Sequence, residues 1–256
     1  MRWIERAVAE SPRLALVPGR CALGHATPGE EWSRGFDYEY HSAANEFRGV
    51  RCTECGAWFL DPRPAERDFG TIYPDSYSAY AMSDASGAAR GLAFRAKAWL
   101  EARKIRRYRR FLAGLHGDVL DVGCGDAQLL DGFARAGVAR GELVGLDFHP
   151  VAVRLARAKG YEVIEGTLET AALGRERFRL AVMNQLIEHV VDPVAALARL
   201  REALVPGGCV FLETPNLASP NARIARARTW GGYHWPRHLH LFSPTSMEQV
   251  LTAAGL

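Results

Sequence analysis

Short apolar runs alternate with amphipathic segments over the second half of the chain. The apolar runs are β-branched or leucine-rich, which is typical of buried strands, and the segments between them have the spacing of helices. We expect strands at 119–122, 143–147, 162–165, 180–184 and 209–213, and helices at 127–136, 150–158, 193–204 and 244–254. This alternation predicts an α/β fold in which helices cover both faces of a parallel sheet.

The composition is that of a globular protein with one α/β domain and a small accessory module. The chain has 256 residues, of which 48% are hydrophobic and 24% charged, and its formal net charge is +3. So mild a charge neither requires nor excludes a nucleic-acid partner. No apolar run approaches the roughly 18 residues of a membrane span, and the N-terminus lacks the apolar core of a signal peptide. We expect a cytoplasmic protein with no membrane partner.

The first predicted strand ends in an acid that is followed closely by two glycines. In the sequence VLDVGCGDAQLL, Asp121 lies at the strand end, and Gly123 and Gly125 form the turn into the next helix. Parallel sheets bind ligands outside the carboxyl ends of their strands, so this turn is a predicted binding site. Gln128 interrupts the third position of a dinucleotide fingerprint, and the carboxylate would repel a pyrophosphate. The ligand should therefore carry a positive charge.

S-adenosylmethionine (SAM) meets this requirement because it has an ammonium and a sulfonium group but no phosphate. Asp121 is placed to accept a hydrogen bond from the ammonium. The next strand ends in Asp147 and Phe148, which suit the two ribose hydroxyls and the adenine ring. As an alternative, Asp147 is an N-cap for the helix that follows.

Several segments together resemble class I SAM-dependent methyltransferases of the small-molecule type. These segments are VLDVGCGDAQLL, VGLDFHPVAVRLA, FRLAVMNQLIEHVVDPVAALARLREALVPGGCVFLETPN and HLHLFSPTSMEQVLTAAGL. The resemblance implies a Rossmann-like sheet, with Thr167 or Leu168 near the adenine. Two departures are Ala127, where such turns often carry another glycine, and Arg179, which we expect on the surface. The candidate cofactor-binding residues are Asp121, Gly123, Cys124, Gly125, Asp147, Phe148, Thr167, Leu168 and Asn184.

Methyl transfer to a hydroxyl needs a base that removes the acceptor's proton. The strand end MNQLIEHV and the later segment GGYHWPRHLHLF supply candidates, and the resemblance places the EH pair by the acceptor pocket. His238 and His240 alternate in a strand-like run, so at most one of them should face that pocket. Helix capping or structural histidines are the alternatives. The candidate catalytic residues are Glu188, His189 and His238.

Three of the five cysteines lie in the N-terminal quarter and suggest a metal site. An odd number of cysteines argues against a disulfide framework, whereas RCTECG has the C-x-x-C-G pattern of a metal knuckle. The first pair, Cys21-x3-His25, has Gly24 where a second cysteine would complete a knuckle. His25 can serve as the fourth ligand, with His41 as the alternative. A reduced thiol cluster is the alternative to zinc. The candidate zinc ligands are Cys21, His25, Cys52 and Cys55.

These signals predict three parts: a zinc-ribbon-like module at 1–81, a hinge and basic linker helix at 82–116, and a methyltransferase domain at 117–256. The family normally adds two strands after its last helix, and they are missing before the sequence stops at LTAAGL. Strand 209–213 should then be an edge, and either the sequence is truncated or a partner or a second copy covers this edge.

We expect SAM-dependent methylation of a small hydroxylated acceptor, such as a sugar, a nucleotide sugar or a secondary metabolite. The zinc segment resembles one that precedes some methyltransferases of sugars and secondary metabolites. An alternative is RNA methylation, with the basic residues of segment 88–115 and its interleaved Trp99 and Tyr108 as the phosphate-binding face. A second alternative is a non-catalytic, SAM-binding scaffold subunit. The basic residues are Lys97, Arg103, Lys104, Arg106, Arg107, Arg109 and Arg110.

Overall fold

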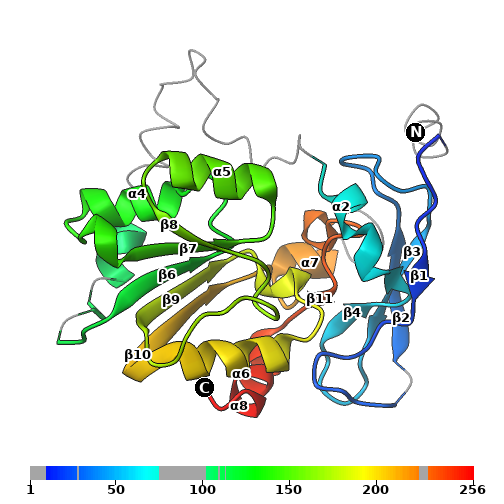
Figure 1. Cartoon of the computed structure of the whole chain (residues 1–256). Coiled ribbons are helices and arrows are strands. Elements are labelled where there is room, and N and C mark those ends of the chain that lie inside the picture. Colours follow the sequence, from blue (N-terminus) through cyan, green and yellow to red (C-terminus); the bar gives the residue numbers. More distant parts are fainter. Residues whose placement is uncertain (1–9, 28, 75–101, 109, 113, 225–229) are drawn as a thin grey trace. The chain divides into compact units, whose positions relative to one another are not determined.

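The computed structural model describes residues 10–27, 29–74, 102–108, 110–112, 114–224 and 230–256. The chain forms two compact units, each built from separate stretches of sequence (Figure 1). The first, here called the cysteine unit, consists of Met1–Pro74, Gln185–Leu197 and Thr214–Leu256. The second, here called the parallel-sheet unit, consists of Asp75–Asn184 and Ala198–Glu213. The boundaries predicted at 81 and 116 stay predictions.

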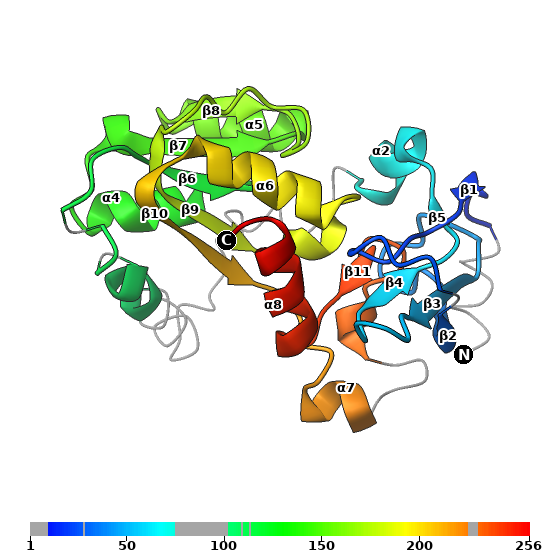
Figure 2. The same ribbon diagram turned by 90° about the horizontal axis from the view of Figure 1, so that it is seen from below.

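The parallel-sheet unit contains the five strands that the apolar runs predict, all in parallel register, in the order β10-β9-β6-β7-β8. Buried β-branched and leucine side chains on the central strands explain why these runs fold as strands. Among the described residues, β10 pairs only with β9 and lies at the edge of the sheet (Figure 2). The strands are β6 (Asp118–Val122), β7 (Leu143–Asp147), β8 (Glu162–Glu165), β9 (Phe178–Asn184) and β10 (Leu204–Glu213).

Helices cover both faces of this sheet, as predicted. Helices α4 (Gln128–Arg135) and α5 (Pro150–Ala158) pack on one face, and α6 (Pro193–Ala203) lies on the other (Figure 1). The predicted α/β, Rossmann-like architecture is therefore confirmed. Arg179, expected on the surface, is only 14% exposed in its side chain, because it forms an ion pair with Glu142 and donates to the Leu115 carbonyl.

The predicted basic helix is shorter than expected over the part that can be compared. Residues 102–108 are helical, whereas residues 110–112 and 114 form turns. Ile105 and Tyr108 are buried against the apolar core of the parallel-sheet unit, and the Tyr108 ring lies 4.5 Å from that of Phe211. The hinge at 82–87 and the positions of Lys97, Trp99 and Arg109 lie outside the described residues.

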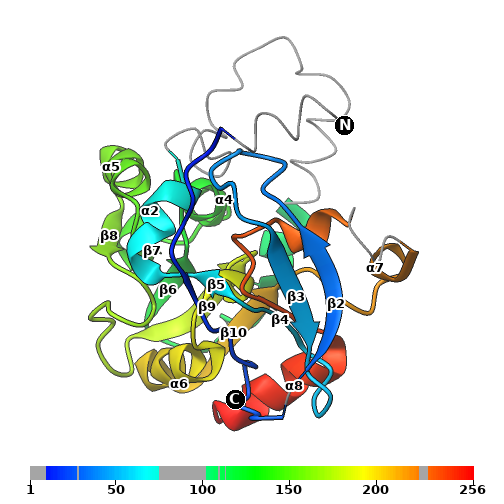
Figure 3. The same cartoon turned by 90° about the vertical axis from the view of Figure 1, so that its right-hand side faces the viewer.

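The cysteine unit is built on a four-stranded antiparallel sheet in the order β11-β4-β3-β2, of which Figure 3 labels β4, β3 and β2. Trp58 of β4 is fully buried because its indole lies directly over Gly49 of β3, and it donates to Ser33 Oγ at 3.0 Å. A second, two-stranded sheet pairs β1 with β5. The strands are β1 (Leu16–Val17), β2 (Glu30–Gly35), β3 (Phe47–Arg51), β4 (Trp58–Leu60), β5 (Arg63–Pro64) and β11 (His240–Leu241).

A buried ion pair joins the two ends of the sequence within the cysteine unit. The Arg237 guanidinium contacts both carboxylate oxygens of Asp37 at 3.1 Å, and both side chains are fully buried. Burial acts to raise the pKa of Asp37, but hydrogen bonds from Arg237 and Ser42 lower it below the usual value. The remaining helices of this unit are η1 (Glu66–Asp68), α2 (Phe69–Ile72), η3 (Ile187–His189), α7 (Pro220–Ile224), η4 (Gly231–Tyr233) and α8 (Pro244–Ala253). In the other unit, η2 (Arg140–Glu142) precedes β7.

Candidate functional site

The turn after β6 is shaped by residues with positive φ. Gly123 and Gly125 have φ angles of 76° and 52°, and the amides of Gly123 and Cys124 both donate to the Leu146 carbonyl of β7. The Cys124 side chain is buried in the core, and its Sγ lies only 2.6 Å from the position that a Cβ on Gly145 would occupy. Only the backbone of Cys124 is thus available to a ligand in this turn.

Ala127 ends the turn in a conformation that usually requires glycine. Its φ of 65° lies in the left-handed region, so α4 begins at Gln128, one residue later than predicted. The departure from the family pattern therefore keeps the backbone shape of a glycine turn and replaces only the residue type.

Three carboxylates are buried around this turn. Asp121, Asp126 and Asp147 are 4%, 3% and 7% exposed. Burial raises the pKa of Asp121 to about 7, and the negative charge of Asp147 adds to the effect. The pKa of Asp147 is also raised, mainly by burial. Asp126 already has a cation partner, because Lys159 Nζ lies 3.8 Å from its Oδ2. The poorly solvated carboxylates of Asp121 and Asp147 favour a cationic ligand.

Asp147 links the glycine turn to the end of β7. Its Oδ2 accepts from the Gly125 amide at 3.0 Å, and its Oδ1 accepts from the His149 amide at 2.9 Å. The N-cap of α5 is His149, whose Nδ1 accepts from the Val151 amide. The alternative role of Asp147 as the cap of this helix is therefore wrong.

Lys104 brings a cation to the same end of the sheet. Its Nζ lies 2.9 Å from Asn184 Oδ1 and 2.5 Å from Glu213 Oε2, at the ends of β9 and β10, and its charge partly offsets the rise in the pKa of Asp121. This position differs from the phosphate-binding face to which the RNA alternative assigns Lys104. The available signal was helical spacing, because Lys104 lies four residues before Tyr108, which is buried.

The other predicted cofactor residues belong to the ends and loops of the same strands. Phe148, directly after β7, is 39% exposed and is one of the few large apolar side chains open to solvent among the described residues. Thr167 is half-buried and bonds Thr170, whereas Leu168 is buried and its carbonyl accepts from Arg199. The exposed Phe148 ring is therefore the best placed of these side chains to stack on a ligand.

The predicted catalytic residues come together in the cysteine unit. One ligand atom from each of Glu188, His189 and His238 lies within 4.8 Å of the other two. Glu188 is fully buried in η3 and accepts from Thr214 Oγ1 at 2.8 Å, and its Oε1 lies 3.9 Å from His238 Nε2. Glu188 and His189 lie in the short helix η3, before α6, and not at the start of α6.

Backbone carbonyls select one tautomer of both histidines. His189 Nδ1 lies 3.0 Å from the Arg237 carbonyl and 2.8 Å from the Tyr73 hydroxyl, and His238 Nδ1 lies 2.7 Å from the Gly232 carbonyl. Because a carbonyl only accepts, we assign the proton to Nδ1 and a lone pair to Nε2 in each ring. Burial lowers the pKa of His189 to about 3 and also lowers that of His238, so both rings are neutral. Tyr73, Thr214 and Arg237 carried no local sequence signal.

The N-terminal cysteines and one histidine form a compact donor cluster. The Sγ atoms of Cys21 and Cys55 are 3.5 Å apart, and His25 Nδ1 lies 3.7 Å from Cys21 Sγ and 3.4 Å from Cys52 Sγ. A tetrahedral zinc site with Zn–S bonds of about 2.3 Å has ligand atoms roughly 3.7 Å apart, so the four residues fit such an ion. His25, and not His41, completes this group.

The loops around the cluster have the geometry of metal knuckles. Gly24 and Gly56 have φ angles of 72° and 71°, and their amides turn back to the carbonyls of Cys21 and Cys52 at 2.8 and 3.0 Å. Burial opposes ionisation of Cys52, but the amides of Cys55 and Glu54, with His25, lower its pKa to about 7. These loops therefore favour thiolate at Cys52.

Within the described residues, no helix is both long and apolar enough to cross a membrane.

Comparison with known proteins adds a family assignment. The methyltransferase domain family matches residues 95–256. A ubiquinone biosynthesis O-methyltransferase of Cereibacter sphaeroides is 30% identical over 149 residues, covering 54% of this chain and 59% of the relative. One of the same name from Alkalilimnicola ehrlichii is 35% identical over 113 residues, covering 41% and 44%. The chain thus spans about three-fifths or less of the length of these two relatives.

Among solved structures, the cyclase SpnF is similar in fold. The two share 18% sequence identity with a TM-score of 0.54, over 75% of this chain and 73% of the other. Identity at this level supports the fold alone. Since the family match extends over more than half of the sequence, the chain belongs to the methyltransferase domain family, as the resemblance of its motifs to class I SAM-dependent methyltransferases predicted.

Proposed function

We propose that this chain transfers the methyl group of SAM to a hydroxyl group of a small acceptor. The observation that carries the proposal is the pair of buried carboxylates at the glycine turn, Asp121 and Asp147, whose pKa values burial raises and which suit a cationic cofactor. Membership of the methyltransferase domain family and similarity to proteins named O-methyltransferases support it. When bound, SAM supplies an electrophilic methyl group on a sulfonium.

Each residue of the turn has a distinct task in this proposal. Asp121 accepts from the ammonium, and the shapes of Gly123 and Gly125 let the cofactor approach the backbone. Asp147 takes the ribose hydroxyls with the lone pairs that its two amide contacts leave, and Phe148 stacks on adenine. The backbone of Cys124 and the loop at Thr167 and Leu168 complete the cofactor site, and Asn184 positions Lys104 beside it.

His189 is the proposed base. Its Nε2 carries the lone pair that takes the proton of the acceptor hydroxyl, while the Arg237 carbonyl and Tyr73 hold the ring at Nδ1. Glu188, which has a carboxylate oxygen within 4.8 Å of a ring nitrogen of His189, stabilises positive charge as the His189 imidazole takes up the proton. His238 orients the acceptor in this arrangement.

We also propose that the cluster of Cys21, His25, Cys52 and Cys55 binds one zinc ion. Four protein ligands leave no open coordination position, which is typical of a structural site. The ion's task is therefore to hold the two knuckle loops together.

Calorimetric titration with SAM and with S-adenosylhomocysteine tests the cofactor site. We expect dissociation constants on the order of micromolar, as for other small-ligand sites, and loss of binding in Asp147→Ala. Glu165→Ala is the matched control, because Glu165 ends the neighbouring strand β8 but is exposed. Absence of binding in a folded, zinc-loaded sample would overturn the proposal and favour the scaffold alternative.

Transfer of a radiolabelled methyl group to phenols, sugars or total RNA tests the acceptor class. The RNA alternative is weakened because Tyr108 is buried in the core and Lys104 bonds Asn184, so neither is free to hold a phosphate. We expect label in a phenol or sugar. In His189→Asn the turnover number should fall by at least about 100-fold, whereas the affinity for SAM should be unchanged. Equal turnover by His189→Asn would exclude His189 as the base. The exposed His116→Asn is the control.

A further inference from the structure

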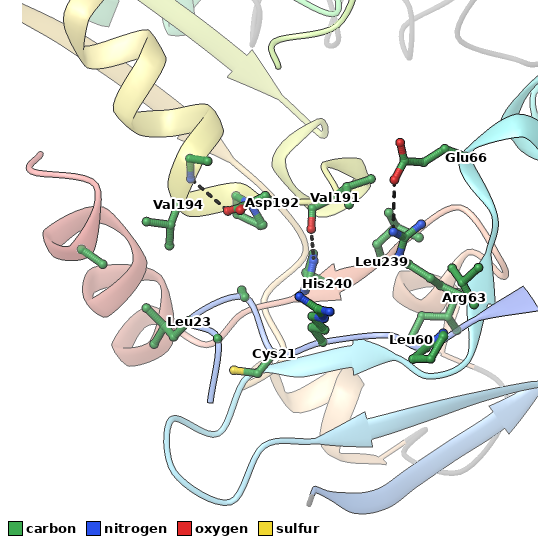
Figure 4. Close-up of a pocket in the computed structure, with 18 of the residues that line it drawn as sticks. Cys21, Leu23, Leu60, Arg63, Glu66, Val191, Asp192, Val194, Leu239 and His240 are labelled. Carbon is green, nitrogen blue, oxygen red and sulfur yellow. Dashed lines mark hydrogen bonds and ion pairs between the residues drawn. The ribbon is translucent and has the colours of Figure 1, made fainter. Parts of the chain in front are cut away.

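The cysteine unit contains a cavity of about 820 Å³ that the proposed reaction does not use (Figure 4). Its walls are the first knuckle at 21–24, parts of segments 60–66 and 191–195, and Leu239 with His240. None of Glu188, His189 and His238 lines it. The volume lies within the roughly 300–1,000 Å³ that is typical of small-molecule sites.

Most of the wall is apolar, and most of its charged groups already have partners. Arg63 forms an ion pair with Glu66 at 3.2 Å (Figure 4). Asp192 accepts from the Ala195 amide at 3.0 Å and so caps the first turn of α6. Because these charged groups are already paired, they line the cavity but do not favour a ligand of a particular charge.

Two lining side chains keep a polar group that has no partner within the described part of the chain. Arg20 is exposed at the wall and has no ion pair there. His240 is only 4% exposed, and its Nε2 donates to the Val191 carbonyl at 3.3 Å, which leaves an accepting lone pair on Nδ1. That buried nitrogen has no hydrogen bond among the described residues. A buried acceptor without a partner is costly, so it favours a ligand that donates.

We propose that this cavity is a second binding site, for a small carboxylic acid that carries a hydroxyl group on an apolar frame. Arg20 binds the carboxylate, and His240 Nδ1 accepts from the hydroxyl. The apolar walls, with Leu23, Leu60 and Leu239, bury the frame. The proposal does not depend on methyl transfer.

The site is separate from the proposed catalytic cluster, Glu188, His189 and His238, although both sites use the segment 238–240. His238 faces Glu188 and His189, whereas His240, two residues later, lines the cavity. The Leu239 amide between them donates to the Glu188 carbonyl at 2.7 Å. The alternation predicted for this run therefore divides the two histidines between two sites.

Three related probes test the ligand class by calorimetry: 4-hydroxyphenylacetate, phenylacetate, which lacks the hydroxyl, and 2-(4-hydroxyphenyl)ethanol, which lacks the carboxylate. We expect the hydroxy acid to bind about 10-fold more tightly than either of the other two, the effect of one lost hydrogen bond in a site that requires it. In Arg20→Gln the advantage over the alcohol should disappear, and in His240→Phe the advantage over phenylacetate should disappear.

Arg13→Gln, an exposed arginine that does not line the cavity, should behave as the unmodified chain does. Thermal melting of every variant checks folding, and the exposed Arg20 provides a variant that cannot fail through loss of core packing. Equal affinity for all three probes, or no saturable binding of the hydroxy acid, overturns the proposal. Binding that is lost in His238→Ala but kept in Arg20→Gln also overturns it, because the probe would then bind at the catalytic cluster.

Discussion

The conformation of a single residue, Ala127, shows how the glycine turn tolerates a residue that the family pattern does not favour. The left-handed φ of 65° costs an alanine roughly 1–2 kcal/mol. Glycine would remove that cost, but it would lose about 0.8 kcal/mol for the buried methyl group and about 0.5–1 kcal/mol of backbone entropy. The two sets of terms nearly cancel, so the turn keeps its shape with either residue.

We therefore expect Ala127→Gly to change the free energy of unfolding by less than about 0.5 kcal/mol. Ala156→Gly is the matched control, because Ala156 is also fully buried but lies inside α5 with ordinary helical geometry. It should cost about 2 kcal/mol, from the lost methyl group and the low helix propensity of glycine. Urea denaturation measures both values. Equal destabilisation by the two substitutions would show that Ala127 is not strained.

Asp121 should give the ligand-free protein a characteristic dependence on pH. Its pKa in the folded state is raised to about 7, above the value of about 3.9 in an unfolded chain. Between these values the folded state binds more protons than the unfolded state, so this group's contribution to stability falls as the pH rises from about 4 to about 7. Asp147 acts in the same direction.

Melting temperatures measured from pH 5 to pH 8 should show a smaller decline with pH in Asp121→Asn than in the unmodified chain. Saturating SAM should also reduce the decline, because a cation beside Asp121 stabilises its charged form. If the Asp121 carboxylate ionises normally in the folded state, the plots of melting temperature against pH for Asp121→Asn and for the unmodified chain should be parallel. That result would contradict the raised pKa.

The two knuckle loops can form a four-ligand metal site only together. Each loop offers two donors, and together they place four donor atoms within 4.8 Å of one another. A short loop has too little apolar surface to hold such a shape, so a metal ion would contribute directly to its folding.

Metal analysis of the purified chain should find about one zinc per molecule. Cys52→Ser should lower the zinc content severalfold and the melting temperature by several degrees, because one of the four ligands is lost. Cys209→Ser is the control, since Cys209 lies in β10 and does not belong to the cluster. Full zinc content in Cys52→Ser would contradict the assigned ligands.

At the scale of the whole molecule, the segments of the two units alternate along the sequence. The cysteine unit takes its first 74 residues from the N-terminal part, but it also needs Gln185–Leu197 and Thr214–Leu256. The later segments supply strand β11 and Arg237, the buried partner of Asp37. The N-terminal module is therefore incomplete without residues from the end of the sequence.

A fragment of residues 1–81 should consequently fail to fold, even with zinc. Without Arg237 the carboxylate of Asp37 would be buried and unpaired, a loss on the order of 3–5 kcal/mol, and β4 would be an exposed edge. Amide proton NMR of the zinc-loaded fragment measures this directly. Well-dispersed signals matching those of the whole chain would show that the module folds independently.

The amino-acid sequence by itself determined the elements and the local parts of the sites. The apolar runs predicted all five parallel strands, since side-chain periodicity is a local property, and the glycine turn and the C-x-x-C knuckle follow from spacing along the chain. Only the tertiary structure decided which distant groups meet. It selected His25 over His41, turned Lys104 toward Asn184, and brought β11 to the N-terminal sheet. Such pairings depend on packing between segments up to about 200 residues apart, for which no local pattern provides a signal.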